Sequence, residues 1–310
     1  MDVNFIMAVI MNGKLLSNKI KQEIREEINF LEIKPGLAVI IVGNDPSSQI
    51  YVKGKIKDCN ECGIKSFEFS LNHNSKEEDI LKLIDELNNR EDIHGIICQL
   101  PLPEGINQQH IIQAISPEKD VDCFHFENLG RVINGNYGFL PCTPQGVMYM
   151  LDYYNITITG KHVVIVNHSN IVGKPQAMLL TNRDATVSIA HKATYALSSL
   201  TRLADILITA VGKKNFIKQH MVKPGAVVID VAIGRDNEGK IYGDVAFDEV
   251  LEVCSHITPV PGGIGLMTRA MLMRNTLIAA KRALGYDYST IVRQDDNKPI
   301  LASKSFSKNY

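Results

Sequence analysis

The chain has little net charge of either sign. Its 33 Lys and Arg residues nearly balance 34 Asp and Glu residues, which leaves a formal net charge of -1 over 310 residues. There is therefore no general basic field to attract nucleic acid, and no acidic excess either. Hydrophobic residues at 45% and charged residues at 22% are typical of globular proteins. The length suggests about two domains, and we expect no nucleic-acid partner.

The sequence also lacks signs of a membrane span or of export. Residues 1–11 are apolar only in patches and carry neither a basic leader nor a small-residue cleavage site. The cysteines are scattered, and Cys59 and Cys62 form a Cys-x-x-Cys pair without a second pair at metal-ligand spacing. Because this pair falls inside an expected helix, we interpret it as structural. We expect a cytoplasmic protein with reduced thiols, no metal site and no membrane partner.

The first half of the chain alternates strand and helix patterns. Apolar runs predict buried strands at 37–42, 65–69 and 93–99. An amphipathic helix is expected over 16–31, and a capping box at 75–78 is expected to open another helix. Strands that alternate with helices predict a parallel sheet covered by helices.

Tyr51 and Lys55 follow the first of these strands. The segment 43–48 is typical of a turn and a helix N-terminus, and in such a helix the two residues stand one turn apart on one face. A phenol beside a primary amine suits proton transfer, because burial or a neighbouring cation favours the neutral amine and frees its lone pair. The alternative is a basic surface helix, since helical lysines are usually solvated.

Gln99 and Asp122 are further candidates for a ligand site. Prolines at positions 101 and 103 force the chain out of the sheet, which places Gln99 at the carboxyl edge where open α/β sheets bind ligands. Its amide could orient Lys55, or it could merely satisfy loop backbone groups. Asp122 lies among apolar residues before a loop, which suits either a carboxylate that pairs with an amidine-like ring edge or an ordinary turn aspartate.

The strand pattern restarts in the second half. Thr143 is expected to cap a helix that has Pro144 at its first position and that crosses into a second domain. Strands are expected at 163–166, 185–190, 204–209 and 226–230. This order outlines a dinucleotide-binding domain. The Gly-x-Gly-x-x-Gly fingerprint is absent, however, and Gly173 is the glycine left in the first turn, so the motif alone leaves the question open.

The residues after the second strand of this half bear on the choice of dinucleotide. NAD enzymes usually place an acidic residue there for the ribose hydroxyls, but this chain has His191, Lys192 and Thr194. A cation without a carboxylate favours a 2′-phosphate, and therefore NADP over NAD. Further on, 210–212 would let the backbone approach the cofactor, and the Pro/Gly loop 257–265 is expected to form a binding wall before a helix over 267–284.

Eight short motifs occur in a fixed order between residues 11 and 284. They are Val42-Gly43 with Ser48, Tyr51-x-x-x-Lys55, Gln99-Leu100-Pro101-Leu102-Pro103, Lys119-Asp120-Val121-Asp122, Pro141-Cys142-Thr143-Pro144, Ser169-Asn170-Ile171-Val172-Gly173-x-Pro175, Val228-Ile229-Asp230-Val231 and Thr258-Pro259-Val260-Pro261-Gly262-Gly263. In this combination the chain closely resembles the bifunctional methylenetetrahydrofolate dehydrogenase/methenyltetrahydrofolate cyclohydrolase family.

The resemblance implies a chemistry for these residues. The enzyme would transfer hydride from 5,10-methylenetetrahydrofolate to NADP, and water would then add to the methenyl product to give 10-formyltetrahydrofolate. Lys55 would be the general acid/base of hydration, held by Gln99. Tyr51 would contact the folate, and Asp122 would accept hydrogen bonds from the pterin. Hydride transfer needs mainly positioning, which two domains facing each other across a cleft would provide.

The resemblance also implies three sets of site residues. The catalytic set is Lys55, Tyr51, Gln99 and Asp122. The substrate-binding set is Ser48, Tyr51, Val52, Lys55, Cys98, Gln99, Leu100, Asp122, Pro259, Pro261, Gly262 and Gly263. The cofactor-binding set is Asn167, His168, Ser169, Ile171, Gly173, Pro175, His191, Lys192, Thr194, Ala210, Val211, Gly212 and Ile233.

The expected architecture is α/β with two domains. Residues 1–149 with 267–310 would form the catalytic, folate-binding domain, and residues 150–266 a Rossmann-like NADP-binding domain. The resemblance also implies a homodimer formed through the nucleotide domains.

The chain departs from the family pattern mainly on the nucleotide side. Asn167 and His168 replace the usual Gly-Arg or Gly-Ala, and we expect the turn to survive because Asn tolerates positive φ. Lys192 replaces a serine and could compensate for a missing arginine, and Cys123 replaces the glycine after Asp122. The alternatives are a cyclohydrolase without dehydrogenase activity, use of NAD, a non-catalytic folate- or nucleotide-binding protein, and an unrelated two-domain NAD(P) dehydrogenase.

Overall fold

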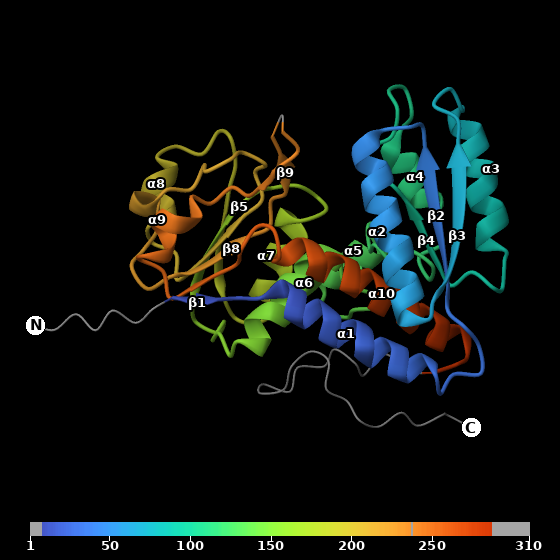
Figure 1. Ribbon diagram of the computed structural model, residues 1–310, viewed down its shortest axis with the longest axis horizontal. Coiled ribbons are helices and arrows are strands. Elements are labelled where there is room, and N and C mark those ends of the chain that lie inside the picture. Colours follow the sequence, from blue (N-terminus) through green and yellow to red (C-terminus); the bar gives the residue numbers. More distant parts are fainter. Residues whose placement is uncertain (1–7, 237, 287–310) are drawn as a thin grey trace, which may run out of the picture. The chain divides into compact units, whose positions relative to one another are not determined.

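The computed structural model describes residues 8–236 and 238–286, which form two compact units (Figure 1). Unit 1 contains residues 8–17 and 143–268, and unit 2 contains residues 18–142 and 269–286. Residues 1–7 and 287–310 lie outside the described part of the chain. The structure therefore does not test what was expected of the N-terminus, or the domain to which these residues were assigned.

Unit 2 is built on a three-stranded parallel sheet. Its strands are β2 (Gly36–Val42), β3 (Lys65–Leu71) and β4 (Gly95–Cys98), in the order β3-β2-β4. All three were predicted, and this part of the prediction is confirmed. The central strand β2 is buried along its whole length, as expected for a parallel strand covered on both faces.

Helices surround this sheet. They are α1 (Gly13–Ile28), α2 (Pro46–Cys62), α3 (Glu77–Asn88), α4 (Gln108–Ala114), α5 (Phe126–Ile133) and α10 (Ile264–Ala283). One apolar core joins β2 and β4 to α3 and α4 through Ile40, Ile84 and Ile111. The start of α3 differs from the predicted capping box, because the Asp79 carboxylate accepts the hydrogen bond from the Lys76 amide, at 3.0 Å.

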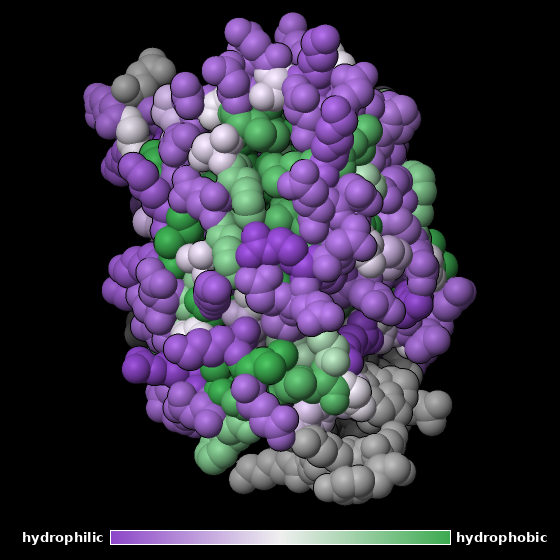
Figure 2. All heavy atoms as spheres, turned by 90° about the vertical axis from the view of Figure 1, so that its right-hand side faces the viewer, coloured by the Kyte–Doolittle hydropathy of each residue, from purple (hydrophilic) through white to green (hydrophobic). Residues whose placement is uncertain are grey.

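The outer side of unit 2 is mainly hydrophilic. Figure 2 looks onto the side that carries α3 and β3, where hydrophobic residues appear in separate patches among hydrophilic ones. The edge strand β3 contributes to this pattern, because exposed Glu68 and Ser70 alternate with half-buried Phe67, Phe69 and Leu71. Polar alternation of this kind is typical of a strand with one solvated face. None of the described helices is long and apolar enough to span a membrane.

Unit 1 is built on a six-stranded parallel sheet. The strands are β1 (Val9–Ile10), β5 (His162–Val166), β6 (Thr186–Ala190), β7 (Ile206–Thr209), β8 (Val227–Asp230) and β11 (His256–Ile257), in the order β1-β11-β8-β7-β5-β6. The four longer strands were predicted and are confirmed. From β5 the chain passes first to β6 on one side and then to β7 on the other, which creates a topological switch point, the usual ligand site of such sheets.

Shorter elements complete unit 1. They are α6 (Cys142–Tyr153), α7 (Gly173–Thr181), α8 (Leu197–Thr201), the 3-10 helix η1 (Gln219–Met221), α9 (Phe247–Leu251) and the hairpin of β9 (Gly234–Arg235) and β10 (Ile241–Tyr242). Helix α6 begins at Cys142, so Thr143 lies inside the helix. The prediction that Thr143 is the N-cap is wrong. The Thr143 hydroxyl instead lies 3.0 Å from the Thr268 hydroxyl.

The division into units differs from the predicted domains in three places, one of which is the return to unit 2 at Arg269, where we expected residue 267. Residues 8–17, expected in the catalytic domain, lie in unit 1 because β1 pairs with β11 in the register Val9 with His256 and Ile10 with Ile257. The crossing into unit 1 comes at Thr143, whereas we expected it at residue 150.

Candidate active site and dinucleotide site

Helix α2 presents Tyr51 and Lys55 as its sequence predicted. The Asp45 carboxylate accepts a hydrogen bond from the Ser48 amide, at 2.7 Å, and Pro46 occupies the first turn. This cap fixes where the helix begins and therefore which residues share a face. Tyr51 is 42% exposed and Lys55 is half-buried one turn later, so both side chains are accessible to a ligand.

The Lys55 ammonium donates a hydrogen bond to the Gln99 side chain. The distance from Nζ to Oε1 is 3.0 Å. Gln99 Nε2 donates in turn to the Leu100 carbonyl at 2.7 Å, and this second bond turns the amide oxygen toward the lysine. A neutral amide acceptor can hold either the ammonium or the amine, because both carry N–H donors. The predicted contact between these two residues is therefore present.

Cys98 precedes this glutamine and is mostly buried. Burial raises the pKa of the Cys98 thiol to about 12, so the group is a neutral thiol near pH 7 and has no nucleophilic thiolate. Burial likewise raises the pKa of the Cys59 and Cys62 thiols to about 12 on α2. The Cys-x-x-Cys pair therefore packs as two small apolar side chains.

Two aspartates in the next loop have different tasks. Asp120 is buried and accepts hydrogen bonds from the Phe124 amide at 3.2 Å and the His125 amide at 2.8 Å, so it organises the loop. Asp122 is half-buried. Within the described part of the chain the Cys142 thiol, 3.7 Å from Oδ1, is its hydrogen-bond partner. The Asp122 carboxylate therefore keeps acceptor capacity for a ligand.

Cys123 explains one departure from the family pattern. Its φ is 62°, a left-handed conformation that costs a non-glycine residue about 1–2 kcal/mol. The side chain is buried and its thiol donates to the Phe139 carbonyl at 3.4 Å. A glycine would adopt the same backbone without strain, so the chain keeps the turn while its buried side chain offsets part of the cost.

In unit 1, Asn167 organises the turn between β5 and α7 through its side chain. Its Oδ1 accepts from the Ser169 amide at 2.8 Å and the Gly173 amide at 3.0 Å, and its Nδ2 donates to the Ala210 carbonyl at 2.7 Å. Asn167 is not among the residues of positive φ, so the predicted reason for the survival of the turn is wrong. A Cβ on Gly173 would lie 2.1 Å from the Asn167 carbonyl oxygen, which is why that position needs glycine.

Two histidines meet at the carboxyl ends of neighbouring strands. His168 follows β5 and His191 follows β6, and their ring centroids are 5.1 Å apart. The Thr194 hydroxyl accepts from the His191 amide at 2.8 Å and closes the turn that carries the exposed Lys192. His168 thus lies on one turn, and His191 and Lys192, the cation predicted to favour a 2′-phosphate, lie on the adjacent turn.

The loop after β7 is held by a residue that sequence reasoning missed. Asp244 is 0% exposed, and its carboxylate accepts hydrogen bonds from the Val211 amide at 2.5 Å and from the Gly212 and Lys213 amides at 2.8 Å each. Its Oδ2 also accepts from the Thr209 hydroxyl at 2.8 Å. The signal in the sequence was a lone aspartate between a glycine and a valine, which we did not examine.

Asp230, at the end of β8, is a second buried carboxyl beside Asp244. Burial, and then the nearby Asp244, raise the pKa of Asp230 to about 6. Asp230 accepts from the Ala232 amide at 3.1 Å and the Val245 amide at 2.9 Å. The two carboxyls thereby tie down the loops that follow β7 and β8.

These loops form a wall that suits a dinucleotide. Ile171, Val211 and Ile233 follow three different strands, and each keeps 37–40% of its surface exposed. Exposed aliphatic side chains beside a glycine-dependent turn at a topological switch point are features of dinucleotide sites. The residues present therefore fit such a cofactor.

The Pro/Gly loop that was predicted to contact folate belongs to unit 1. The Gly262 carbonyl accepts from the Lys14 amide at 3.1 Å, and a Cβ on Gly13 would lie 2.2 Å from the Gly263 carbonyl oxygen. The loop is thus packed closely against the start of α1. The roles of Pro259, Pro261, Gly262 and Gly263 in substrate binding stay predictions.

Family models match both parts of the chain. The catalytic domain of tetrahydrofolate dehydrogenase/cyclohydrolase matches residues 11–122, and the NAD(P)-binding domain of the same family matches residues 141–284. The chain belongs to the tetrahydrofolate dehydrogenase/cyclohydrolase family. The expectation drawn from the eight motifs is thereby confirmed.

Individual members of the tetrahydrofolate dehydrogenase/cyclohydrolase family are similar over most of the chain. The bifunctional protein FolD of Ruminiclostridium cellulolyticum is 52% identical over 272 residues, which covers 87% of this chain and 96% of that protein. The crystal structure of the bifunctional enzyme FolD from Campylobacter jejuni is 50% identical, covers 89% of this chain and 99% of that one, and has a TM-score of 0.88. The Trypanosoma brucei enzyme, solved with NADP and an inhibitor, is 37% identical, covers 89% of this chain and 98% of that one, and has a TM-score of 0.86.

Proposed function

We propose that the protein oxidises 5,10-methylenetetrahydrofolate with NADP and hydrolyses the methenyl product to 10-formyltetrahydrofolate, with Lys55 as the acid/base of hydrolysis. The two activities are those of the family to which the chain belongs. The observation that carries the residue assignment is the pair of hydrogen bonds that fixes the Gln99 amide, with its oxygen 3.0 Å from Lys55 Nζ.

The hydrolysis needs a group that first removes and then returns a proton. Water adds to the methenyl carbon and loses a proton to the Lys55 amine, and the resulting ammonium then protonates the ring nitrogen as the C–N bond breaks. Gln99 stabilises both states because its oxygen accepts an N–H from either. A carboxylate in its place would bind the ammonium more tightly and would hold back the second transfer.

Substrate recognition rests on Tyr51 and Asp122. The exposed Tyr51 ring, one turn before Lys55, offers an aromatic face to the folate. Asp122 accepts hydrogen bonds from the guanidine-like edge of the pterin, for which its carboxylate geometry is suited. Both residues bind and orient the substrate, while proton transfer is left to Lys55.

For the oxidation, the residues of unit 1 hold the dinucleotide and its 2′-phosphate. Bound NADP would accept the hydride. The Asn167 turn and the Asp244-held loop supply backbone near the cofactor, and Lys192 with His168 supplies a cation and polar nitrogens for the phosphate. The two adjacent turns, residues 167–175 and 191–194, contain no carboxylate that could bind the ribose hydroxyls of NAD. This composition favours NADP.

The function is tested with purified protein and 5,10-methylenetetrahydrofolate, given NADP and NAD in parallel. Reduced cofactor with NADP and little with NAD is the expected result. A signal with NAD alone would contradict the 2′-phosphate proposal while keeping the dehydrogenase. If neither NADP nor NAD is reduced, hydrolysis of methenyltetrahydrofolate is measured next. Persistence of methenyltetrahydrofolate in that assay would contradict both proposed activities.

The family resemblance extends the proposal to a cytoplasmic homodimer. We expect neither a nucleic-acid nor a membrane partner, because the net charge is -1 and the described helices include none suited to a membrane. Analytical ultracentrifugation of the full-length protein tests the dimer, and a single species of monomer mass would contradict it.

A further inference from the structure

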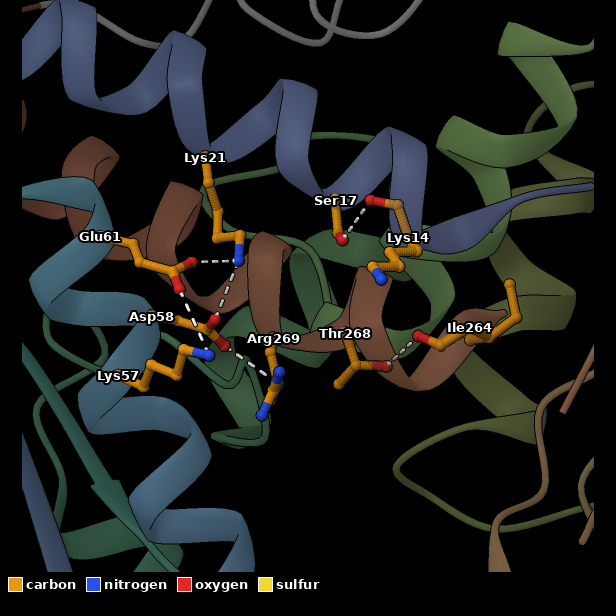
Figure 3. Close-up of polar contacts among 9 residues, drawn as sticks. All are labelled: Lys14, Ser17, Lys21, Lys57, Asp58, Glu61, Ile264, Thr268 and Arg269. Atoms are coloured by element: carbon orange, nitrogen blue, oxygen red, sulfur yellow. Dashed lines mark hydrogen bonds and ion pairs between the residues drawn. The ribbon is translucent and has the colours of Figure 1, made fainter. Parts of the chain in front are cut away.

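A buried carboxylate on α2 lies where three helices meet, three residues after Lys55. Asp58 is 2% exposed and is flanked by cations from two other helices (Figure 3). Lys21 Nζ, from α1, is 3.1 Å from Asp58 Oδ1, and Arg269 Nε, from α10, is 2.9 Å from Oδ2. Lys21 also pairs with Glu61. None of these residues takes part in the chemistry proposed above.

Arg269 lies directly on the backbone of α2. A Cβ at Gly54 would be 2.0 Å from Arg269 Nη1, so the guanidinium fills the space that a side chain would occupy. Gly54 and Asp58 are four residues apart and share one face of the helix. Arg269 therefore runs along a full turn of α2, and Lys55 belongs to that turn.

Besides its N-cap and the Lys55–Gln99 hydrogen bond, the fixed orientation of α2 depends on packing. Among the side chains of α2 whose burial the structure describes, the fully buried ones other than Asp58 are small, namely Ser48, Val52, Cys59 and Cys62. Small apolar side chains tolerate sliding and rotation of a helix better than large interdigitating ones. The Asp58 carboxylate, by contrast, accepts a hydrogen bond from Lys21 Nζ on Oδ1 and forms an ion pair with Arg269 through Oδ2, which ties α2 to both neighbouring helices.

Stabilisation of the fold is a weak explanation for the buried ion pairs of Asp58. Replacing a buried ion pair with apolar residues of similar volume is often neutral or stabilising, because the charges lose their hydration. Breaking such a pair from one side is costly, since it leaves an unpaired buried charge. The separation of these two effects makes a positioning role testable.

The same helix also holds the loop of Asp122. Asn275, 0% exposed on α10, donates through Nδ2 to the Val121 carbonyl at 2.7 Å and to the Leu140 carbonyl at 2.9 Å. Helix α10 thus supports Lys55 through Arg269 and supports Asp122 through Asn275, within unit 2.

We propose that Arg269 is a positioning residue for hydrolysis, which places Lys55 by holding Asp58 and the Gly54 face of α2. This proposal rests on the proposed acid/base role of Lys55.

The deciding variant is the double substitution Asp58→Ala with Arg269→Met in the full-length protein. It removes both charges of the Asp58–Arg269 pair, Lys21 keeps its pair with Glu61, and Met keeps much of the arginine stem. We expect a melting temperature within about 5 °C of the wild type. The kcat of methenyltetrahydrofolate hydrolysis should fall about tenfold or more, with KM within about threefold, because a displaced base affects the chemical step rather than binding.

Two single variants complete the series. Arg269→Lys keeps a cation near Asp58 but has no guanidinium to fill the space over Gly54, so its kcat should lie between those of the wild type and the double variant. Arg274→Met is the matched control, because Arg274 lies on the same helix and pairs with Glu23 of α1, 3.6 Å away. It should leave hydrolysis unchanged.

The outcomes separate this inference from the proposed function. A double variant with wild-type kcat would overturn the positioning role, and so would an equal loss of kcat in Arg274→Met. Lys55→Met is measured beside them. If that variant keeps wild-type hydrolysis, the role of Lys55 itself is wrong, whereas loss of hydrolysis there with a fully active double variant refutes only the role of Arg269.

Discussion

Asp244→Asn should weaken the use of NADP and leave the hydrolysis intact. The Asp244 carboxylate is 0% exposed, with the Gly212 and Lys213 amides on Oδ1 and the Thr209 hydroxyl and Val211 amide on Oδ2. Asparagine is nearly isosteric but retains one oxygen. Its amide N–H₂ group would face N–H or O–H donors that it cannot satisfy.

The expected loss follows from the two hydrogen bonds that disappear. Each hydrogen bond to a charged group contributes about 1.5–3 kcal/mol, so the variant should lose about 3–6 kcal/mol of unfolding free energy. For a protein of this size the melting temperature should fall by about 5–10 °C. The loop that carries Val211 and Gly212 would loosen as well, and the KM for NADP should rise about tenfold.

Thermal unfolding and both activity assays check this prediction. Hydrolysis should keep its wild-type kcat below the new melting temperature, because Lys55, Gln99 and Asp122 belong to unit 2. Asp236→Asn is the control, since Asp236 accepts from the Lys240 amide at 2.9 Å in the exposed hairpin and its loss should leave the melting temperature close to that of the wild type. An Asp244→Asn protein with wild-type stability and wild-type KM for NADP would refute the reasoning.

Three further substitutions test other parts of the site. The pKa of Asp230 is raised from 3.8 to about 6, so its contribution to stability is complete below about pH 4 and is lost as pH rises through about 6. The unfolding free energy of Asp230→Asn, measured by urea denaturation, should therefore rise by about 3 kcal/mol relative to that of the wild type between pH 4 and pH 7. A difference that stays constant with pH would contradict this. Gln99→Glu should move the pH–rate profile of hydrolysis to higher pH and lower kcat near pH 7 about tenfold, because a carboxylate favours the Lys55 ammonium; an unshifted profile would argue against that pairing. Lys192→Ser should raise the KM for NADP about threefold to tenfold without changing the KM for NAD, and equal changes would show that the lysine does not contact the 2′-phosphate.

The sequence was most informative where structure depends on local pattern. The apolar runs identified β2, β4, β5 and β7 because buried parallel strands are continuously hydrophobic. The contact between Lys55 and Gln99 was also predictable. Helix α2, which carries Lys55, follows the carboxyl end of β2, and Gln99 follows the carboxyl end of the neighbouring parallel strand β4.

Features that depend on distant partners were not predictable in this way. Strands β1 and β11 have two residues each and exist as strands only because β8 and each other supply their hydrogen bonds. Asp244 acts on a loop some thirty residues earlier in the chain, with its nearest amide contact at Lys213, 31 positions away. Periodicity carries no information about such pairs.

Local sequence rules failed at two positions whose conformation depends on their surroundings. Thr143 has the right chemistry for an N-cap, yet the helix begins at Cys142. Asn167 was expected to preserve its turn through a positive φ, but its side chain does so by bonding to the backbone around it. In both cases the choice depends on neighbouring groups that the sequence alone does not place in space.

The central claim is that Lys55 is the acid/base of hydrolysis and not a general structural residue. Lys55→Met removes the amine and keeps the length of the side chain, and both activities of the purified variant are measured at saturating substrate. Methenyltetrahydrofolate hydrolysis should fall at least about 100-fold, the usual contribution of a general acid/base, while NADP reduction should fall less than about tenfold. Equal loss of both activities, or hydrolysis at the wild-type rate, would contradict the assignment.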